Sequence, residues 1–273
     1  MHQPLGTKMK TQKQNIRYAN KDIKMTKTLF TLLSIIVSIL LFSCSDDSPT
    51  EVEKDKEQVI TGDVILSSQA DVDSFTGTSI LGSLYITGED ITNLDGLSSL
   101  TSIRDIFEVS GNALLTNLNG LRNITSVRYF SIISNSALTN LDGLSNITSA
   151  TSLQVSANKA LMNIDGLINL TSVDDLLQIT GTDFLTNLDG LGNLASVDAI
   201  YIFLNSALTN LDGMSSLTSL KFIWIDDNKV LKSFCGLYPR LSSGVLADRY
   251  YSVSGNMVNP SQQQIIDDGP CTQ

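Results

Sequence analysis

The stretch Leu138–Leu144, Leu-Thr-Asn-Leu-Asp-Gly-Leu, returns along the chain in seven copies. The copies begin at Ile91, Leu115, Leu138, Leu161, Leu185, Leu208 and Leu231, at intervals of 23 or 24 residues. A fixed period of this length is typical of solenoids, in which each repeat forms one coil that packs against its neighbours. The phrase therefore predicts a repeat architecture.

Apolar residues recur within each repeat at two different spacings. From the first leucine of the phrase onward they stand at every third residue, as in the series Leu138, Leu141, Leu144, Ile147 and Ala150. Before the next phrase the spacing becomes two, as at Phe130 and Ile132, which is typical of a strand with alternate residues buried. Each coil is predicted to contain one short strand and a turn or a single helical turn.

Two columns of asparagine and one of glycine accompany the apolar positions. We expect both asparagine columns to bond the backbone of neighbouring coils. The first column precedes the phrase and is interrupted by Thr182; the second lies inside it. The glycine of the phrase is present in every copy, which implies a left-handed backbone or a close approach of coils. The first column is Asn112, Asn135, Asn158, Asn205 and Asn228, and the second is Asn93, Asn117, Asn140, Asn163, Asn187 and Asn210.

A column of aspartates stands directly before the glycines and is interrupted by Asn119. Neighbouring carboxylates in this column are expected at about one strand spacing, ~4.8 Å. Each one is predicted to accept hydrogen bonds from backbone amides in an Asp-Gly turn. A calcium site is the alternative, but one carboxylate per coil falls short of a calcium shell, so no metal is predicted. The column is Asp95, Asp142, Asp165, Asp189 and Asp212.

The pattern Leu-x-Ile-x-x-Asn-x-x-Leu-Thr-Asn-Leu-Asp-Gly-Leu-x-Asn-Leu-Thr-Ser resembles leucine-rich repeats, within them the receptor L-domain type of bacterial surface lipoproteins. The resemblance runs from about Val59 to the C-terminus. It implies an α/β-type, right-handed solenoid of about seven 23- to 24-residue coils with one parallel sheet, capped at both ends. For function it implies binding, without naming a ligand.

The segment before the repeats is predicted to be a targeting signal and a tether. Lys24 and Lys27 precede the apolar run 29–42, which is too short to span a membrane, so residues 1–43 are interpreted as a signal peptide. Met25 stands where such a peptide usually begins, which leaves residues 1–24 open as an upstream misread start. The following Cys44 and its acidic neighbours resemble the lipidation site of Bacteroidota-type lipoproteins, which implies anchoring at the outer membrane, facing the exterior. Residues 44–58 are polar and predict a flexible tether.

The ends of the repeat region are predicted to be caps. Residues 59–90 hold the N-terminal cap and first coil, with a strand at Val64–Leu66 and a short helix near Ser67–Phe75. Residues 91–241 form the repeats, and 242–273 the C-terminal cap, with one or two irregular strands at 245–258 and a short helix from Asn259 to about Gly269. Cys235 and Cys271 are the two remaining cysteines; we predict one disulfide, with two free thiols as the alternative.

Charge and composition exclude several function classes. From Cys44 onward 11 basic residues face 27 acidic ones, a net charge of −16, which argues against nucleic acid as a partner and leaves the lipid as the membrane contact. The single histidine, His2, lies in the predicted signal peptide, so histidine-dependent catalysis and histidine-bound zinc are excluded for the mature chain. The chain is predicted to be no enzyme and to need no cofactor.

The strongest candidate site is an aromatic cluster on the outward side of the last two repeat strands. Its predicted members are Tyr201, Phe203, Phe222, Trp224 and Asp226, with Tyr201 and Trp224 side by side on parallel strands. Exposed aromatic clusters are typical of contact sites for proteins or glycans. The alternative is that the C-terminal cap folds over the cluster and buries it. For the whole protein, a structural or self-associating envelope component without a dedicated ligand remains the alternative function.

Overall fold

The computed structural model describes residues 57–271. The predicted signal peptide, the lipidation site Cys44 and the tether up to residue 56 lie outside the described residues. Within 57–271, no helix has both the length and the apolar character needed to cross a membrane.

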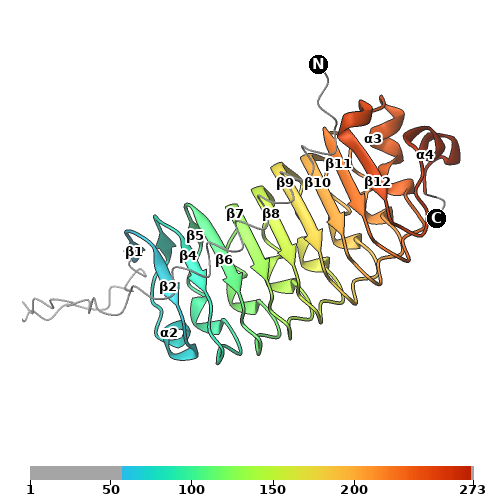
Figure 1. Cartoon of the computed structure of the whole chain (residues 1–273). Helices are drawn as coiled ribbons and strands as arrows, with labels where there is room; N and C mark the ends of the chain where they lie inside the picture. The colour runs from blue at the N-terminus through green and yellow to red at the C-terminus, as the bar shows by residue number, and fades with distance from the viewer. Residues whose placement is uncertain (1–56, 272–273) are drawn as a thin grey trace, which may run out of the picture. The chain divides into compact units, whose positions relative to one another are not determined.

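The main sheet has nine parallel strands, ordered β12-β11-β10-β9-β8-β7-β6-β4-β2. Each strand pairs with the strand of the next coil, as the colour order in Figure 1 shows. This regular recurrence of strands and turns confirms the prediction of a solenoid-like repeat. The strands are β2 (Val64–Leu66), β4 (Leu84–Ile86), β6 (Ile106–Ser110), β7 (Ser126–Ile133), β8 (Ser149–Ser156), β9 (Ser172–Thr180), β10 (Ser196–Phe203), β11 (Phe222–Asp226) and β12 (Tyr251–Ser254).

A second parallel sheet lies in the N-terminal coils, so the prediction of a single sheet is wrong there. It consists of β1 (Val59–Ile60), β3 (Ser79–Ile80) and β5 (Ser102–Ile103). Each of these strands has only two residues, too few to show an alternating pattern in the sequence. Ile80 and Ile103 are buried, so the small sheet adds a second side to the core of these coils.

The repeated phrase forms a single turn of 3-10 helix in every coil. In one coil the helix is η3 (Asp142–Leu144), and the Leu144 amide donates to the Leu141 carbonyl at 2.9 Å. The apolar positions predicted to face inward are buried, from Leu138 through Ala150 in that coil. The other six helices are η1 (Asp95–Leu97), η2 (Asn119–Leu121), η4 (Asp165–Leu167), η5 (Asp189–Leu191), η6 (Asp212–Met214) and η7 (Cys235–Leu237).

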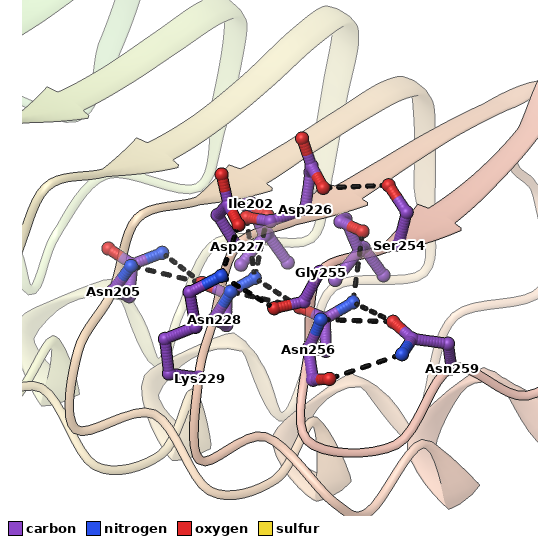
Figure 2. A network of polar contacts seen from close by, with 11 residues as sticks. Ile202, Asn205, Asp226, Asp227, Asn228, Lys229, Ser254, Gly255, Asn256 and Asn259 are labelled. Atoms are coloured by element: carbon purple, nitrogen blue, oxygen red, sulfur yellow. Dashed lines mark hydrogen bonds and ion pairs between the residues drawn. The ribbon is translucent and has the colours of Figure 1, made fainter.

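The first asparagine column forms a buried ladder between coils, as predicted. The Asn112 amide N–H and side-chain Nδ2 both donate to Asn135 Oδ1, at 3.1 and 2.9 Å, while Asn112 Nδ2 also donates to the Ile86 carbonyl at 3.0 Å. Figure 2 shows the C-terminal end of the ladder, where it passes through Asn256 and finishes at Asn259. The ladder therefore pairs backbone groups at the bends that follow the strands, except at Asn158 after β8, where Thr182 takes the place of the next asparagine.

The second asparagine column acts within its own coil, so that part of the prediction is wrong. Asn140 Oδ1 accepts a hydrogen bond from the Asp142 amide two residues later, at 3.1 Å, and the same bond recurs in the other copies that contain this asparagine. This is an Asx-type turn, which a short amide side chain forms with its own backbone. A repeating column in the sequence does not distinguish such a local bond from one between coils.

The invariant glycine marks a close approach of coils. A Cβ on Gly166 would lie 1.8 Å from the Leu141 carbonyl oxygen of the preceding coil. Positive φ angles recur instead at a corner just after the strands, where Ser134 (57°), Ala157 (56°) and Leu204 (59°) adopt left-handed backbone. Of the two predicted reasons for the glycine, contact between coils is the correct one.

The caps contain the predicted elements together with two further short helices. The N-terminal helix α2 (Gln69–Asp73) begins after Ser68, whose side chain accepts from the Asp71 amide. At the other end α3 (Tyr238–Ser242) follows η7 directly, and η8 (Asp248–Tyr250) precedes β12. Helix α4 (Gln262–Asp268) begins after Ser261 and ends at Gly269. The structure joins Cys235 and Cys271 in a disulfide, which ties the tail to the last coil.

Candidate functional site

The aromatic cluster occupies adjacent strands in the predicted register. Tyr201 of β10 pairs with Trp224 of β11, and their ring centroids lie 5.5 Å apart with an edge-on geometry. Trp224 also stacks against Phe203 at 5.8 Å, and Tyr201 contacts Phe222 edge-on at 5.6 Å. The strands bring these four rings together because Ile200, Ile202, Ile223 and Ile225 alternate with them and are buried on the opposite side of the sheet.

Every member of the cluster is half-buried. The rings owe part of this burial to one another, since each of them contacts at least one other ring of the cluster. Aromatic side chains packed in this way are held in place while they keep part of their surface in water. A ligand would therefore meet a surface that is already ordered.

The C-terminal cap extends the sheet beside the cluster. Its strand β12 pairs in parallel with β11, which places Ser252 next to Trp224 and Ser254 next to Asp226. Asp226 accepts a hydrogen bond from Ser254 Oγ at 2.7 Å, as Figure 2 shows. The sequence left open the alternative that the C-terminal cap folds over the rings. In the structure the cap strand β12 instead continues the sheet next to β11.

Electrostatics around Tyr201 favour its neutral phenol. Partial burial of the ring and, to a smaller extent, the charge of Asp175 raise the pKa of Tyr201 above its usual value. The phenol keeps its proton at neutral pH and is able to donate as well as accept a hydrogen bond.

Polar side chains continue the outward face toward the middle of the chain. Gln178 of β9 is paired with Tyr201, and Thr180 with Phe203. Beyond them Gln154 of β8 donates to Ser156 Oγ at 3.0 Å. The sequence analysis did not include Gln178 and Thr180 as neighbours of the cluster. Their positions in the repeat could have shown it, because each precedes the next copy of the phrase by the same number of residues as Tyr201 and Phe203 do.

A second group of reactive side chains surrounds the disulfide. Asp212 Oδ1 lies 2.8 Å from Ser233 Oγ and 3.0 Å from Cys235 Sγ, with Cys271 Sγ close by. Three such groups suit a metal ion when the cysteines are thiolates. In a disulfide the sulfurs carry neither a proton nor a negative charge, so the oxidised group is a poor metal site.

The aspartate column does not act as predicted. The Asp142 amide donates to Asn140, and the Asp142 carbonyl accepts from Ser145 at 3.3 Å, so the turn uses the backbone of the aspartate. Within residues 57–271, the carboxylates of Asp95, Asp142, Asp165 and Asp189 accept no hydrogen bond. The prediction that they accept from backbone amides is wrong. Burial, followed by the charges of Asp165 and Asp212, raises the pKa of Asp189.

Comparisons with known proteins provide no relative for the chain. None of the protein-family models that were compared matches it, and no curated protein matches it either. The function is therefore inferred from the residues and from the geometry of the sheet.

Proposed function

We propose that the chain is a non-catalytic, cell-surface lipoprotein that binds a protein or polysaccharide ligand through the outward face of its main sheet. One observation carries the proposal: Tyr201, Phe203, Phe222 and Trp224 form an ordered, half-buried cluster on adjacent strands, and the cap strand continues the sheet beside them. Ordered aromatic side chains supply large contact areas and lose little entropy on binding.

The finer features of the architecture belong to the same proposal. The solenoid is right-handed and of the receptor L-domain type of leucine-rich repeat, with about seven coils between its two caps. Supporting this are the phrase with its period of 23 or 24 residues and the alternation of one strand with one 3-10 turn in each coil. Such a frame is rigid, so specificity lies in the variable residues of the strands.

The proposed location follows from the sequence before the repeats. Lipid on Cys44 anchors the protein to the outer membrane, with the solenoid facing the exterior and no membrane contact other than the lipid. We expect Cys44→Ala to abolish incorporation of labelled palmitate and to release the protein from the membrane fraction. Lipid incorporation that persists in this variant would contradict the proposed anchor.

A second candidate function, self-association in the envelope, is favoured by the N-terminal edge of the main sheet. Among residues 57–271 no strand pairs beyond β2 at this edge, and Ile65 of β2 is 66% exposed. An edge strand with an exposed apolar side chain is a template for pairing with another chain. Concentration-dependent oligomers that disappear in Ile65→Lys would support this function.

An array of proteins and glycans tests the main proposal. The full chain is applied beside Trp224→Ala, which lacks the central ring, and Tyr129→Ala, which removes an aromatic side chain from β7 of the same sheet. We expect a specific hit that Trp224→Ala loses and Tyr129→Ala keeps. A blank array together with oligomers that depend on Ile65 would replace the binding proposal by self-association.

A further inference from the structure

Two rows of side chains cross the outward face of the main sheet, one residue per strand. The strand register defines the central row as Glu108, Ser131, Gln154, Gln178, Tyr201 and Trp224. The same register defines the second row as Ser110, Ile133, Ser156, Thr180, Phe203 and Asp226. Both rows lead from hydroxyl and amide groups into the aromatic cluster.

Several polar groups beside the rings have unused hydrogen-bonding capacity. In the described part of the chain, the Gln178 amide, the Thr180 hydroxyl and the Tyr201 phenol form no hydrogen bond, and all three side chains are half-buried. Gln178 and Tyr201 are direct neighbours in the central row. A half-buried amide without a partner gains more from a bound ligand than an amide that is already paired.

The two rows contain no cation. Their only acids are Glu108 and Asp226, near opposite ends, and each accepts from a serine hydroxyl at 2.7 Å. Charged pairs such as Lys221 with Asp198 stand outside the rows. A phosphate, sulfate or uronate would find no positive partner among these rows, so an anionic ligand does not suit the face.

We propose that the ligand is a neutral polysaccharide that lies across strands β8 to β11. This deepens the proposed function and depends on it. Pyranose rings present apolar C–H faces to aromatic side chains and hydroxyls to amides and phenols. The cluster followed by Gln178 and Thr180 offers both kinds of contact side by side. Strands repeat at ~4.8 Å, which is about the length that one extended hexose unit spans, so successive sugars meet successive strands.

The sole tryptophan of the chain, Trp224, reports binding directly. The probes are neutral hexasaccharides of glucan, mannan and xylan type, with hexagalacturonate as the charged comparison. We expect a saturable change of Trp224 emission with at least one neutral hexasaccharide and none with hexagalacturonate. Equal or tighter binding of hexagalacturonate would overturn the inference.

Substitutions locate the subsites by calorimetry with the same hexasaccharide. Gln178→Ala is expected to weaken binding about 5-fold, because it removes neutral hydrogen bonds, and Tyr201→Ala about 10-fold. The matched control Tyr129→Ala, two strands from Gln178, should change the affinity by less than about 2-fold, within the effect of one weak contact. Circular dichroism and thermal unfolding must first show that each variant is folded; equal affinity of all three folded variants would overturn the inference.

The outcomes separate this inference from the proposed function. If no hexasaccharide binds, but a protein on the array binds the full chain and not Tyr201→Ala, the glycan inference fails and the binding function remains. If neither ligand class binds, both fail.

Discussion

One residue, Thr182, interrupts the asparagine ladder at its centre. Its hydroxyl donates to Asn205 Oδ1 at 2.7 Å and so replaces the side-chain bond that an asparagine would make toward the C-terminal half of the ladder. Toward the N-terminus, the shorter threonine side chain does not take the place of the asparagine Oδ1, which in the other coils accepts from the backbone amide of the preceding ladder residue. Within residues 57–271, the amide N–H of Asn158 has no acceptor at this point, although Asn158 is fully buried. An unpaired buried N–H destabilises the folded state.

We therefore predict that Thr182→Asn stabilises the protein. The new Oδ1 would accept from the Asn158 amide as the other ladder asparagines do, and the expected gain is about 1 kcal/mol in the free energy of unfolding. Urea unfolding followed by circular dichroism measures it. The matched control is Asn205→Thr, which creates a second interruption and should destabilise by about 1–3 kcal/mol. A loss of stability in Thr182→Asn would mean that the coil spacing here does not admit an amide.

Gly166 permits a second prediction at the residue scale. In Gly166→Ala the Cβ meets the Leu141 carbonyl, a backbone atom that cannot rotate away, and we expect a loss of about 3 kcal/mol or more. The comparison is Gly111→Ala, where the nearest atom to a new Cβ is 3.8 Å away and only the positive φ of 70° is unfavourable. That variant should lose about 1 kcal/mol. Equal losses in thermal unfolding would contradict the close-approach explanation.

At the scale of elements, repetition determines which features the sequence predicts. Tyr201 and Trp224 are 23 residues apart, one period, so counting alone placed them on adjacent strands, and the register confirms it. The position of the C-terminal cap relative to the cluster could not be predicted by counting residues, because residues 242–271 contain no copy of the repeat. Likewise, Asn112 and Asn140 belong to two columns that repeat in the same way. The Asn112 side chain bonds the backbone of another coil, whereas the Asn140 side chain bonds the backbone of its own coil.

Within the aspartate column, Asp189 gives the stability of the protein a pH dependence. The pKa of Asp189 is raised in the folded state, so the folded protein binds this proton more tightly than the unfolded chain does. The stability that this group contributes is present below its ordinary pKa of 3.8 and is lost as the pH rises through the folded value. We predict that Asp189→Asn is more stable than the parent at pH 7 and that the difference shrinks toward pH 3. An equal difference at both pH values in urea unfolding would contradict the charge explanation.

The disulfide stabilises the C-terminal cap as an element. It closes a loop with a sequence separation of 36 between η7 and the end of the chain beyond α4. Breaking it with Cys271→Ser is expected to lower the free energy of unfolding by about 2–4 kcal/mol, chiefly through the greater freedom of the unfolded chain. Phosphine reduction of the parent protein should cause the same loss, and the reduced variant should show no further change. Unchanged unfolding would mean that the cap is held by packing alone.

For the whole solenoid, stability is approximately a sum over coils and their contacts, because each coil touches mainly the next. The buried leucines, the ladder and the close approach at the glycines all act between neighbours. A change of length by one full period should therefore leave the remaining coils intact.

Deleting residues 139–161, one period of 23, tests this directly. The deletion joins Leu138, the first position of one copy of the phrase, to Met162, the second position of the next copy, so the phrase stays in register. It also lets β7 pair with β9. We expect a folded protein with lower stability and unchanged Trp224 emission, since the coils that hold the aromatic cluster keep their neighbours. The control deletes residues 139–150, half a period, which places polar residues at buried positions and should prevent folding. If the full-period deletion also fails to fold, the coils are not interchangeable, and the frame that presents the aromatic face depends on contacts beyond nearest neighbours.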